Sequence, residues 1–163
     1  FPQTSSPAEQ ATNIPNDVHS VTTNSKVEQV HSVLCIEDNP SNLRLIETIL
    51  ENRPDINLLS AMQGGIGLDL ARQHEPDLIL LDLDLPDIKG HEVITRLQRS
   101  SITKDIPVVI VSADATPGQI ERLLAAGAKA YLTKPLDVGQ FLTTISQFLG
   151  TTPEMTPQKK ESN

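Results

Sequence analysis

The chain has 163 residues, of which 37% are hydrophobic and 21% charged, a composition typical of one globular domain with some spare chain and not of a wholly disordered protein. Its formal net charge of −8 disfavours a surface built for direct binding of nucleic acid phosphates. No apolar run approaches the roughly 18 residues of a membrane-spanning helix, and no basic and apolar signal pattern opens the chain, so we expect a cytoplasmic protein without membrane insertion.

Composition divides the chain into three segments. Residues 1–30 are rich in Ser, Thr, Pro, Asn and Gln and have no hydrophobic period, so we expect a flexible linker or tail. Residues 31–150 alternate short apolar runs with amphipathic stretches, which predicts one folded domain; this segment holds ten Lys or Arg and 16 Asp or Glu, a formal charge of −6. Residues 151–163 are polar again and are expected to form a flexible C-terminal tail.

Strands and helices are expected to alternate along the domain. Short apolar runs predict strands at residues 33–36, 56–60, 78–81, 108–111 and 130–133. Apolar residues that recur every three or four positions predict helices at residues 41–51, 67–74, 92–99, 117–126 and 137–149. Strict alternation implies right-handed crossovers and a doubly wound parallel sheet covered on both faces, a three-layer α/β sandwich.

The composition of the strands predicts their order. The first, third and fourth strands are apolar throughout, as central strands are, whereas polar residues interrupt the second and fifth, as expected at edges. The order 2-1-3-4-5 satisfies this pattern, and it is the order of flavodoxin-like (βα)5 folds, in which ligands bind beside the first and third strands. A functional site is therefore expected at the carboxyl ends of those two strands.

Acidic residues follow both of these strands. Glu37 and Asp38 come after the first strand, Asp82 directly after the third, and Asp84 two residues later. Two like charges about 4 Å apart repel by about 4 kcal/mol at an effective dielectric constant near 20, so converging carboxylates call for a cation. Oxygen ligands without neighbouring His or Cys favour a hard ion such as Mg²⁺. Solvated loop carboxylates are the alternative, which the expected convergence disfavours.

The fourth and fifth strands end in hydrogen-bond donors. Ser112 ends the fourth strand, and Lys134 follows the fifth. Alone, Lys134 could neutralise buried acids and Ser112 could cap a helix. Together with a carboxylate nucleophile and a metal ion, the hydroxyl and the ammonium form a set suited to phosphoryl transfer.

Four motifs resemble the signatures of the response-regulator receiver (CheY-like) family: IEDNP, LILLDLDLPDIKG, VVIVSAD and YLTKP. The spacings of 44 residues from Asp38 to Asp82, 30 from Asp82 to Ser112 and 52 from Asp82 to Lys134 are typical of the family. The resemblance implies that Asp82 is the phosphoacceptor and that Lys134 contacts the phosphoryl group. It also implies a site for Mg²⁺ or Mn²⁺, whose ligands would be Glu37, Asp38, Asp82 and the backbone carbonyl of Asp84.

The resemblance further implies a conformational switch. Ser112, in place of the commoner threonine, would be the switch hydroxyl, and Tyr131 the aromatic side chain that turns inward and alters the face formed by the fourth helix, fifth strand and fifth helix. An ordinary edge-strand tyrosine is the alternative for Tyr131. Pro86, Gly90 and Pro135 are expected to shape the loops of the site. Gly64, Gly65 and Gly67 are expected to serve the turn into the second helix.

The implied function is that of a receiver in a two-component phosphorelay. A phosphohistidine on a histidine kinase or a histidine-phosphotransfer domain would be the donor. The domain would catalyse its own phosphorylation and dephosphorylation but act mainly as a switch for a downstream protein that the sequence does not identify. The stretch IEDNPSNLRLIETIL resembles receivers at the carboxyl end of hybrid sensor histidine kinases, so the full-length protein would be a protein-histidine kinase with residues 1–30 as an interdomain linker. A stand-alone regulator is the alternative, and the start at Phe1 agrees with either a piece of a longer protein or a processed chain.

Two other functions fit parts of the pattern. A phosphatase of the haloacid dehalogenase type also uses an Asp-x-Asp pair, but that pair follows an early strand, whereas here an acid pair lies upstream of it. A flavin-binding flavodoxin-like protein is disfavoured because acidic loops would repel the cofactor phosphate.

Overall fold

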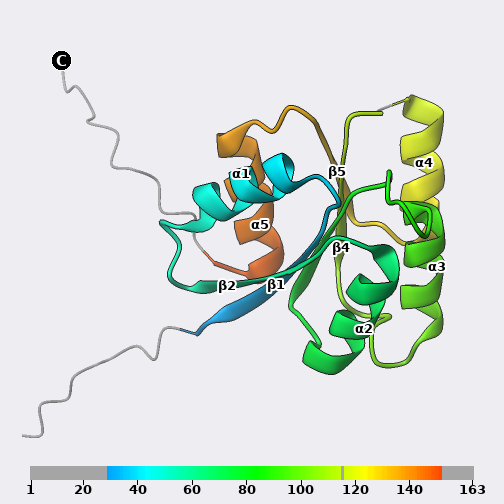
Figure 1. Cartoon of the computed structure of the whole chain (residues 1–163), viewed down its shortest axis with the longest axis horizontal. Coiled ribbons are helices and arrows are strands. Elements are labelled where there is room, and N and C mark those ends of the chain that lie inside the picture. Colours follow the sequence, from blue (N-terminus) through cyan, green and yellow to red (C-terminus); the bar gives the residue numbers. More distant parts are fainter. Residues whose placement is uncertain (1–28, 115, 152–163) are drawn as a thin grey trace, which may run out of the picture.

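The described part of the chain, residues 29–114 and 116–151 of a computed structural model, forms a parallel sheet with helices on both faces (Figure 1). The strands are β1 (His31–Ile36), β2 (Ile56–Ala61), β3 (Leu78–Leu81), β4 (Val108–Ser112) and β5 (Ala130–Thr133). The helices are α1 (Pro40–Leu50), α2 (Gly64–His74), α3 (Gly90–Arg99), α4 (Pro117–Ala126) and α5 (Val138–Leu149). The predicted alternation and the α/β class are confirmed.

The strand order is β2-β1-β3-β4-β5, as predicted from the apolar and interrupted strands. The register places Ile36 of β1 beside Leu81 of β3, so the residues that follow, Glu37 and Asp82, leave the sheet side by side. At the same, carboxyl end of the strands, Ser112 of β4 pairs with Thr133 of β5. The parallel register alone therefore brings the expected site residues to one edge of the sheet.

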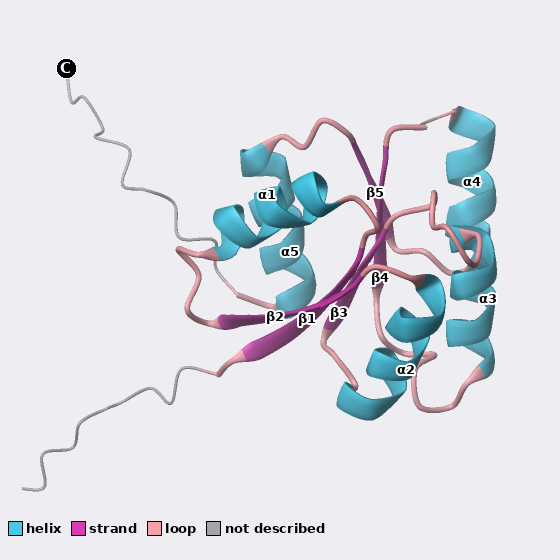
Figure 2. Cartoon of the chain, viewed as in Figure 1, coloured by secondary structure: helices cyan, strands magenta, loops and turns pink. Residues whose placement is uncertain are grey.

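The sheet separates two hydrophobic cores, as the three layers in Figure 2 show. Helices α1 and α5 cover one face, and α2, α3 and α4 cover the other (Figure 1). Side chains alternate between the faces along each strand: Leu34 and Ile36 belong to the α2–α4 core, whereas Val33 and Cys35 belong to the α1/α5 core. Both cores therefore hold the strand ends in fixed positions.

Two helix starts differ from the sequence-based boundaries by more than one residue. Helix α2 begins at Gly64 and α3 at Gly90, three and two residues before the predicted starts. Gly64 and Gly65, assigned to the turn into this helix, instead lie within its first turn, and Gly67, predicted as its first residue, also lies within it. A Cβ atom at Gly67 would lie 2.4 Å from Cδ1 of Ile36. The absence of a side chain at Gly67 therefore allows α2 to pack closely against β1.

The expected linker and C-terminal tail fall almost wholly outside the described residues. Only residues 29–30 and 151 of those segments are included. Among the described residues, no helix combines the length and apolar character that crossing a membrane requires.

Candidate phosphoryl and metal site

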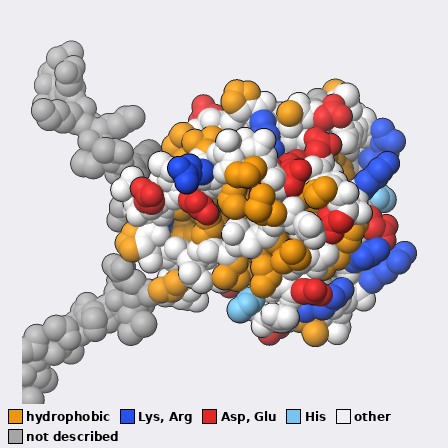
Figure 3. Space-filling view, viewed as in Figure 1, with side chains coloured by type: hydrophobic (Ala, Val, Ile, Leu, Met, Phe, Trp, Pro, Cys, Tyr) orange, Lys and Arg blue, Asp and Glu red, His pale blue; other side chains and the backbone are white. Residues whose placement is uncertain are grey.

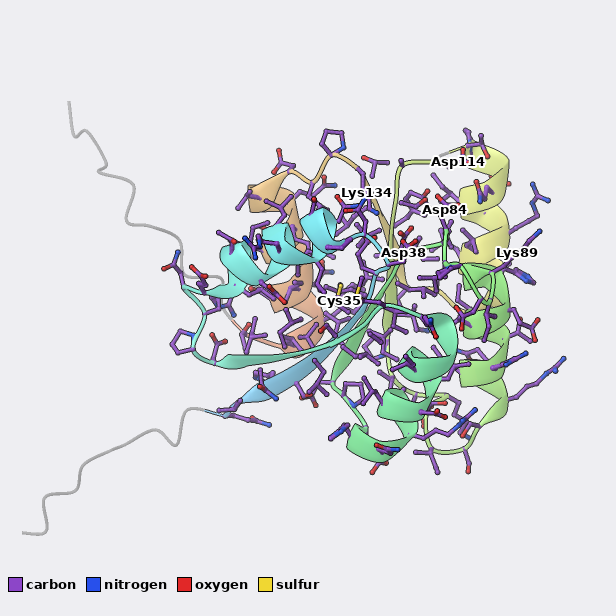
Figure 4. All side chains as sticks on the ribbon, viewed as in Figure 1. Cys35, Asp38, Asp84, Lys89, Asp114 and Lys134 are labelled. Carbon is purple, nitrogen blue, oxygen red and sulfur yellow. The ribbon has the colours of Figure 1, made fainter. Side chains whose placement is uncertain are left out.

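The candidate site lies at the carboxyl edge of the sheet, around the ends of β1, β3, β4 and β5. Figure 4 shows the labelled side chains Asp38, Asp84, Asp114 and Lys134 gathered at this edge. All of them come from segments that directly follow a strand. The sheet thus brings together groups that lie up to about a hundred residues apart in the chain.

Three carboxylates form the centre of the site. One oxygen from each of Glu37, Asp38 and Asp82 lies within 4.8 Å of the others. Glu37 and Asp82 are only 2% and 4% exposed, whereas Asp38 is partly exposed. The side chain of Asp38 has no hydrogen-bond partner among the described residues, which leaves its oxygens available to an ion. This set of oxygen donors, open to solvent on the Asp38 side, fits a hard divalent cation.

Lys134 provides the positive charge against these acids. Its Nζ donates to Glu37 Oε2 at 2.8 Å and to Asp82 Oδ2 at 3.3 Å. Burial opposes the charged ammonium, but the hydrogen bond to Glu37 and the negative charges of Asp82 and Glu37 outweigh it and raise the pKa of Lys134. Lys134 is therefore protonated at neutral pH and holds two buried carboxylates together.

Burial affects Glu37 in the opposite way. It raises the pKa of this carboxyl by more than the hydrogen bond from Lys134 lowers it, because an ionised carboxylate loses hydration in the interior. A divalent cation in the cluster would favour the ionised form. Such an ion would therefore offset the cost of burying Glu37 in its ionised form.

Backbone amides orient the carboxylates. Asn39 N–H donates to Glu37 Oε1 at 3.0 Å, and Asp84 N–H donates to Asp82 Oδ1 at 3.2 Å. Since Lys134 occupies the other oxygen of each acid, Glu37 and Asp82 both have fixed orientations. Asn39 is also the N-cap of α1, where its side chain accepts from Ser41 N–H. The same residue therefore orients Glu37 and caps the first helix.

Ser112 and Tyr131 hold the loop after β4. Ser112 is fully buried, and its Oγ accepts a hydrogen bond from Asp114 N–H at 3.3 Å. The hydroxyl of half-buried Tyr131 donates to the carbonyl of Asp114. Both expected switch residues thus contact the same loop residue, which links the floor of the site to β5.

The expected loop-shaping residues border the site. The Gly90 N–H donates to the Leu83 carbonyl at 3.1 Å, closing the loop between β3 and α3. Pro86 lies in this loop and, with Asp38 and Asp84, lines a cavity of about 470 Å³ that extends toward α4. Pro135 follows Lys134 through a cis peptide bond.

Two residues near the site were not singled out from the sequence. Lys89 lines the cavity that contains Asp38 and Asp84, and Figure 3 shows Lys and Arg side chains along the side of α3 and α4. Asp87 accepts backbone hydrogen bonds from Gly64 and Gly65 at the start of α2. The one sequence signal for Asp87 is indirect: the helix it caps starts after Gln63, a poor N-cap residue.

Comparisons with known proteins agree with the geometry. The family model described as "Response regulator receiver domain" matches residues 33–146. The chain is similar to the polar-differentiation response regulator DivK of Brucella ovis, with 40% identity over 119 residues that cover 73% of this chain and 96% of DivK.

Two solved structures are also similar. One is the receiver domain of a sensor histidine kinase from Pseudomonas aeruginosa PAO1, with a magnesium ion in its active-site cleft; the TM-score is 0.68 at 25% identity, covering 75% of this chain and 99% of that one. The other is a phosphorylated cyanobacterial phytochrome response regulator, with a TM-score of 0.63 at 27% identity, covering 73% of this chain and 93% of that one.

Proposed function

The chain belongs to the response-regulator receiver family of two-component systems, and we propose that it accepts a phosphoryl group on Asp82 from a phosphohistidine. One observation carries the choice of Asp82: its carboxylate is almost fully buried, yet it lies in the acid cluster with Glu37 and Asp38 and 3.3 Å from the Lys134 ammonium. A buried acid with both acidic and basic neighbours is suited to a reaction in which its own charge changes.

Glu37, Asp38, Asp82 and the backbone carbonyl of Asp84 would hold Mg²⁺ or Mn²⁺. When bound, the ion would neutralise the repulsion between the acids and withdraw electrons from the phosphoryl oxygens. The magnesium ion in the similar receiver from P. aeruginosa supports this proposal.

The chain's own groups would carry out the transfer. An oxygen of Asp82 attacks phosphorus, the new P–O bond forms as the P–N bond to the donor imidazole breaks, and the imidazole leaves with the bonding electrons. The Lys134 ammonium, now bound to Glu37 and Asp82, would turn toward the phosphoryl oxygens. The Ser112 hydroxyl would give up its contact with Asp114 N–H and donate a hydrogen bond to the phosphoryl group instead. Tyr131 would respond by moving inward.

The donor would be a histidine kinase or a histidine-phosphotransfer domain, and a downstream protein would bind the face formed by α4, β5 and α5.

We propose that the domain, residues 31–150, is the carboxyl-terminal receiver of a hybrid histidine kinase in the cytoplasm, with residues 1–30 as linker and 151–163 as tail. The extent of the similarity to DivK, which covers 96% of that protein, supports a stand-alone regulator as the second context. The gene sequence upstream of Phe1 distinguishes the two.

The test of Asp82 is labelling of the full chain by acetyl phosphate with Mg²⁺, followed by intact mass. We expect the natural chain to gain the mass of one phosphoryl group and Asp82→Asn to gain none. Circular dichroism should show that the variant keeps its fold, because Asn is nearly the same size as Asp. Labelling that persists in Asp82→Asn would show that another residue is the acceptor. Steady hydrolysis of phosphomonoesters would instead favour a phosphatase.

A further inference from the structure

We propose that Asp87 is a positioning residue of the metal and phosphoryl site, which acts by fastening the loop between β3 and α3 to the first turn of α2. The proposal rests on the proposed function, because that loop carries Asp84, whose backbone carbonyl is the expected metal ligand. Nothing in the four family motifs assigns this task to Asp87.

The contact is a two-point bond. Asp87 Oδ1 accepts from Gly64 N–H at 2.8 Å, and Oδ2 accepts from Gly65 N–H at 2.9 Å. These N–H groups belong to the first turn of α2, where amides have no partner within the helix. The N-cap residue Gln63 makes no side-chain capping bond. Asp87 thus supplies from 22 and 23 residues away what a local cap supplies in other helices.

The charge of Asp87 strengthens the contact. The two backbone hydrogen bonds lower the pKa of the Asp87 carboxyl, so the group is ionised at neutral pH. A negative charge beside the N-terminus of a helix is also favoured by the helix dipole.

The rest of the loop is fastened only at its base. Asp82 N–H donates to the Ile36 carbonyl at 3.0 Å, and Gly90 N–H donates to the Leu83 carbonyl at 3.1 Å. Between these points, Asp84 N–H donates to Asp82 Oδ1, and the Lys89 carbonyl accepts from the N–H groups of Glu92 and Val93 at the start of α3. The tip of the loop therefore depends on Asp87 for its polar anchorage.

Apolar contacts support the same junction. A Cβ atom at Gly64 would lie 3.2 Å from Cβ of Ile88 and 3.4 Å from Cδ1 of Leu85, so the start of α2 lies directly against the loop. Leu85 and Ile88 also pack against the α2–α4 core. These contacts should keep the fold intact when Asp87 is replaced, while the precise position of the Asp84 carbonyl is lost.

The test is calorimetric titration of the full chain with MgCl₂, comparing Asp87→Asn and Asp87→Ala with the natural chain. Outer residues that orient metal ligands typically contribute about 10- to 100-fold to affinity. We expect the Mg²⁺ dissociation constant to rise about 10-fold in Asp87→Ala and less in Asp87→Asn, whose amide oxygen can still accept one bond. The Mg²⁺ concentration that half-saturates labelling by acetyl phosphate should rise in parallel, with a similar maximal extent of labelling.

Asp77→Asn is the matched control. The Asp77 carboxylate also accepts a backbone hydrogen bond, a single one from Ser32 N–H at 2.8 Å, but it lies at the opposite end of β3. Its replacement changes the net charge by the same amount and should leave the Mg²⁺ affinity unchanged. If the natural chain neither binds Mg²⁺ nor becomes labelled, the proposed function fails. If the natural chain binds Mg²⁺ and becomes labelled, but Asp87→Asn has the same Mg²⁺ affinity as Asp77→Asn, the proposed role of Asp87 is wrong. If Asp87→Ala does not fold, the comparison between the two Asn variants alone decides.

Discussion

Gly90 illustrates how the lack of a side chain shapes the candidate site. A Cβ atom at this position would lie 2.7 Å from the Leu83 Cα and 3.1 Å from the Asp82 carbonyl oxygen. Backbone atoms cannot rotate away as a flexible side chain can, so any larger residue must displace the start of α3 or the segment that follows Asp82. The glycine thus allows the β3–α3 loop to close tightly beside the proposed phosphoacceptor.

Replacing Gly90 with alanine should therefore destabilise the protein and disturb the site. We expect Gly90→Ala to lower the free energy of unfolding by about 1–3 kcal/mol, the usual range for overpacking, and to slow labelling by acetyl phosphate. Urea denaturation measures the first effect, and intact mass over time the second. The control is Gly118→Ala in α4, where no atom lies within 4 Å of the added Cβ; it should be neutral or stabilise by up to about 1 kcal/mol. Equal losses in both variants would contradict the steric argument.

A buried arginine connects the start of β2 to the end of α5. Arg53, 7% exposed, donates to both carboxylate oxygens of Asp55 at 2.9 and 2.8 Å. It also donates to Ser146 Oγ at 3.0 Å and to Thr151 Oγ1 at 3.1 Å. A single guanidinium thus holds the turn after α1 against the last turn of α5, on the face opposite α2, α3 and α4.

This pair predicts a pH-dependent contribution to stability. The hydrogen bonds from Arg53, more than its charge, lower the pKa of the Asp55 carboxyl. A carboxyl whose pKa is lower in the folded state stabilises the fold above the unfolded value, about 3.9, and this contribution is lost as the pH falls through the folded pKa. We expect Asp55→Asn to lower the free energy of unfolding by about 1–2 kcal/mol at neutral pH.

The measurement is urea denaturation of the natural chain and Asp55→Asn at several pH values. The difference between them should stay constant from neutral pH down to about 5 and shrink below about 4, as Asp55 becomes protonated. Comparing the two proteins at each pH cancels the titration of the other carboxylates. A difference that does not change with pH would show that the pair stabilises the fold by packing alone.

The strands and their order could be predicted well from the sequence because strands that are buried on both faces are apolar throughout. The uninterrupted runs of β1, β3 and β4 identify central strands, and parallel strands then bring Glu37, Asp82 and Lys134 to one edge. Helix starts were less predictable, since Gly64 and Gly90 are weak helix formers that packing retains within helices. The bonds of Asp87 to the start of α2 and of Arg53 to the end of α5 were not predicted, because nothing local indicates partners 22 to 98 residues away.

Charge is distributed unevenly over the domain. Six of the ten Lys and Arg residues in the domain lie between residues 89 and 129, so the remainder of residues 31–150 holds four basic and 12 acidic residues. In the space-filling view, basic side chains follow α3 and α4, and acidic ones lie near the carboxyl edge of the sheet (Figure 3). Lys134 is the only Lys or Arg in the described chain with an ion pair to the acid cluster. Repulsion at this edge therefore works against the compact state, and a bound cation would reduce it.

Binding of Mg²⁺ should consequently raise the melting temperature. An ion present at about 100 times its dissociation constant stabilises the native state by about 2.7 kcal/mol, which corresponds to roughly 5–15 °C for a domain of this size. The variant that tests the site is Asp38→Asn, because Asp38 has no hydrogen-bond partner among the described residues and its loss should leave the fold intact. We expect Mg²⁺ to raise the melting temperature of the natural chain far more than that of Asp38→Asn.

Salt alone also weakens the repulsion between like charges, so NaCl at the same ionic strength is the necessary control. Screening acts on the whole acidic surface and should stabilise the natural chain and Asp38→Asn to a similar extent, whereas coordination depends on the cluster itself. Asp77→Asn, which removes one negative charge at the far end of β3, should respond to Mg²⁺ like the natural chain. If NaCl reproduced the full effect of Mg²⁺, the acids at the sheet edge would be solvated charges without a bound ion, and the assignment of Glu37, Asp38 and Asp82 as ligands would have to be withdrawn.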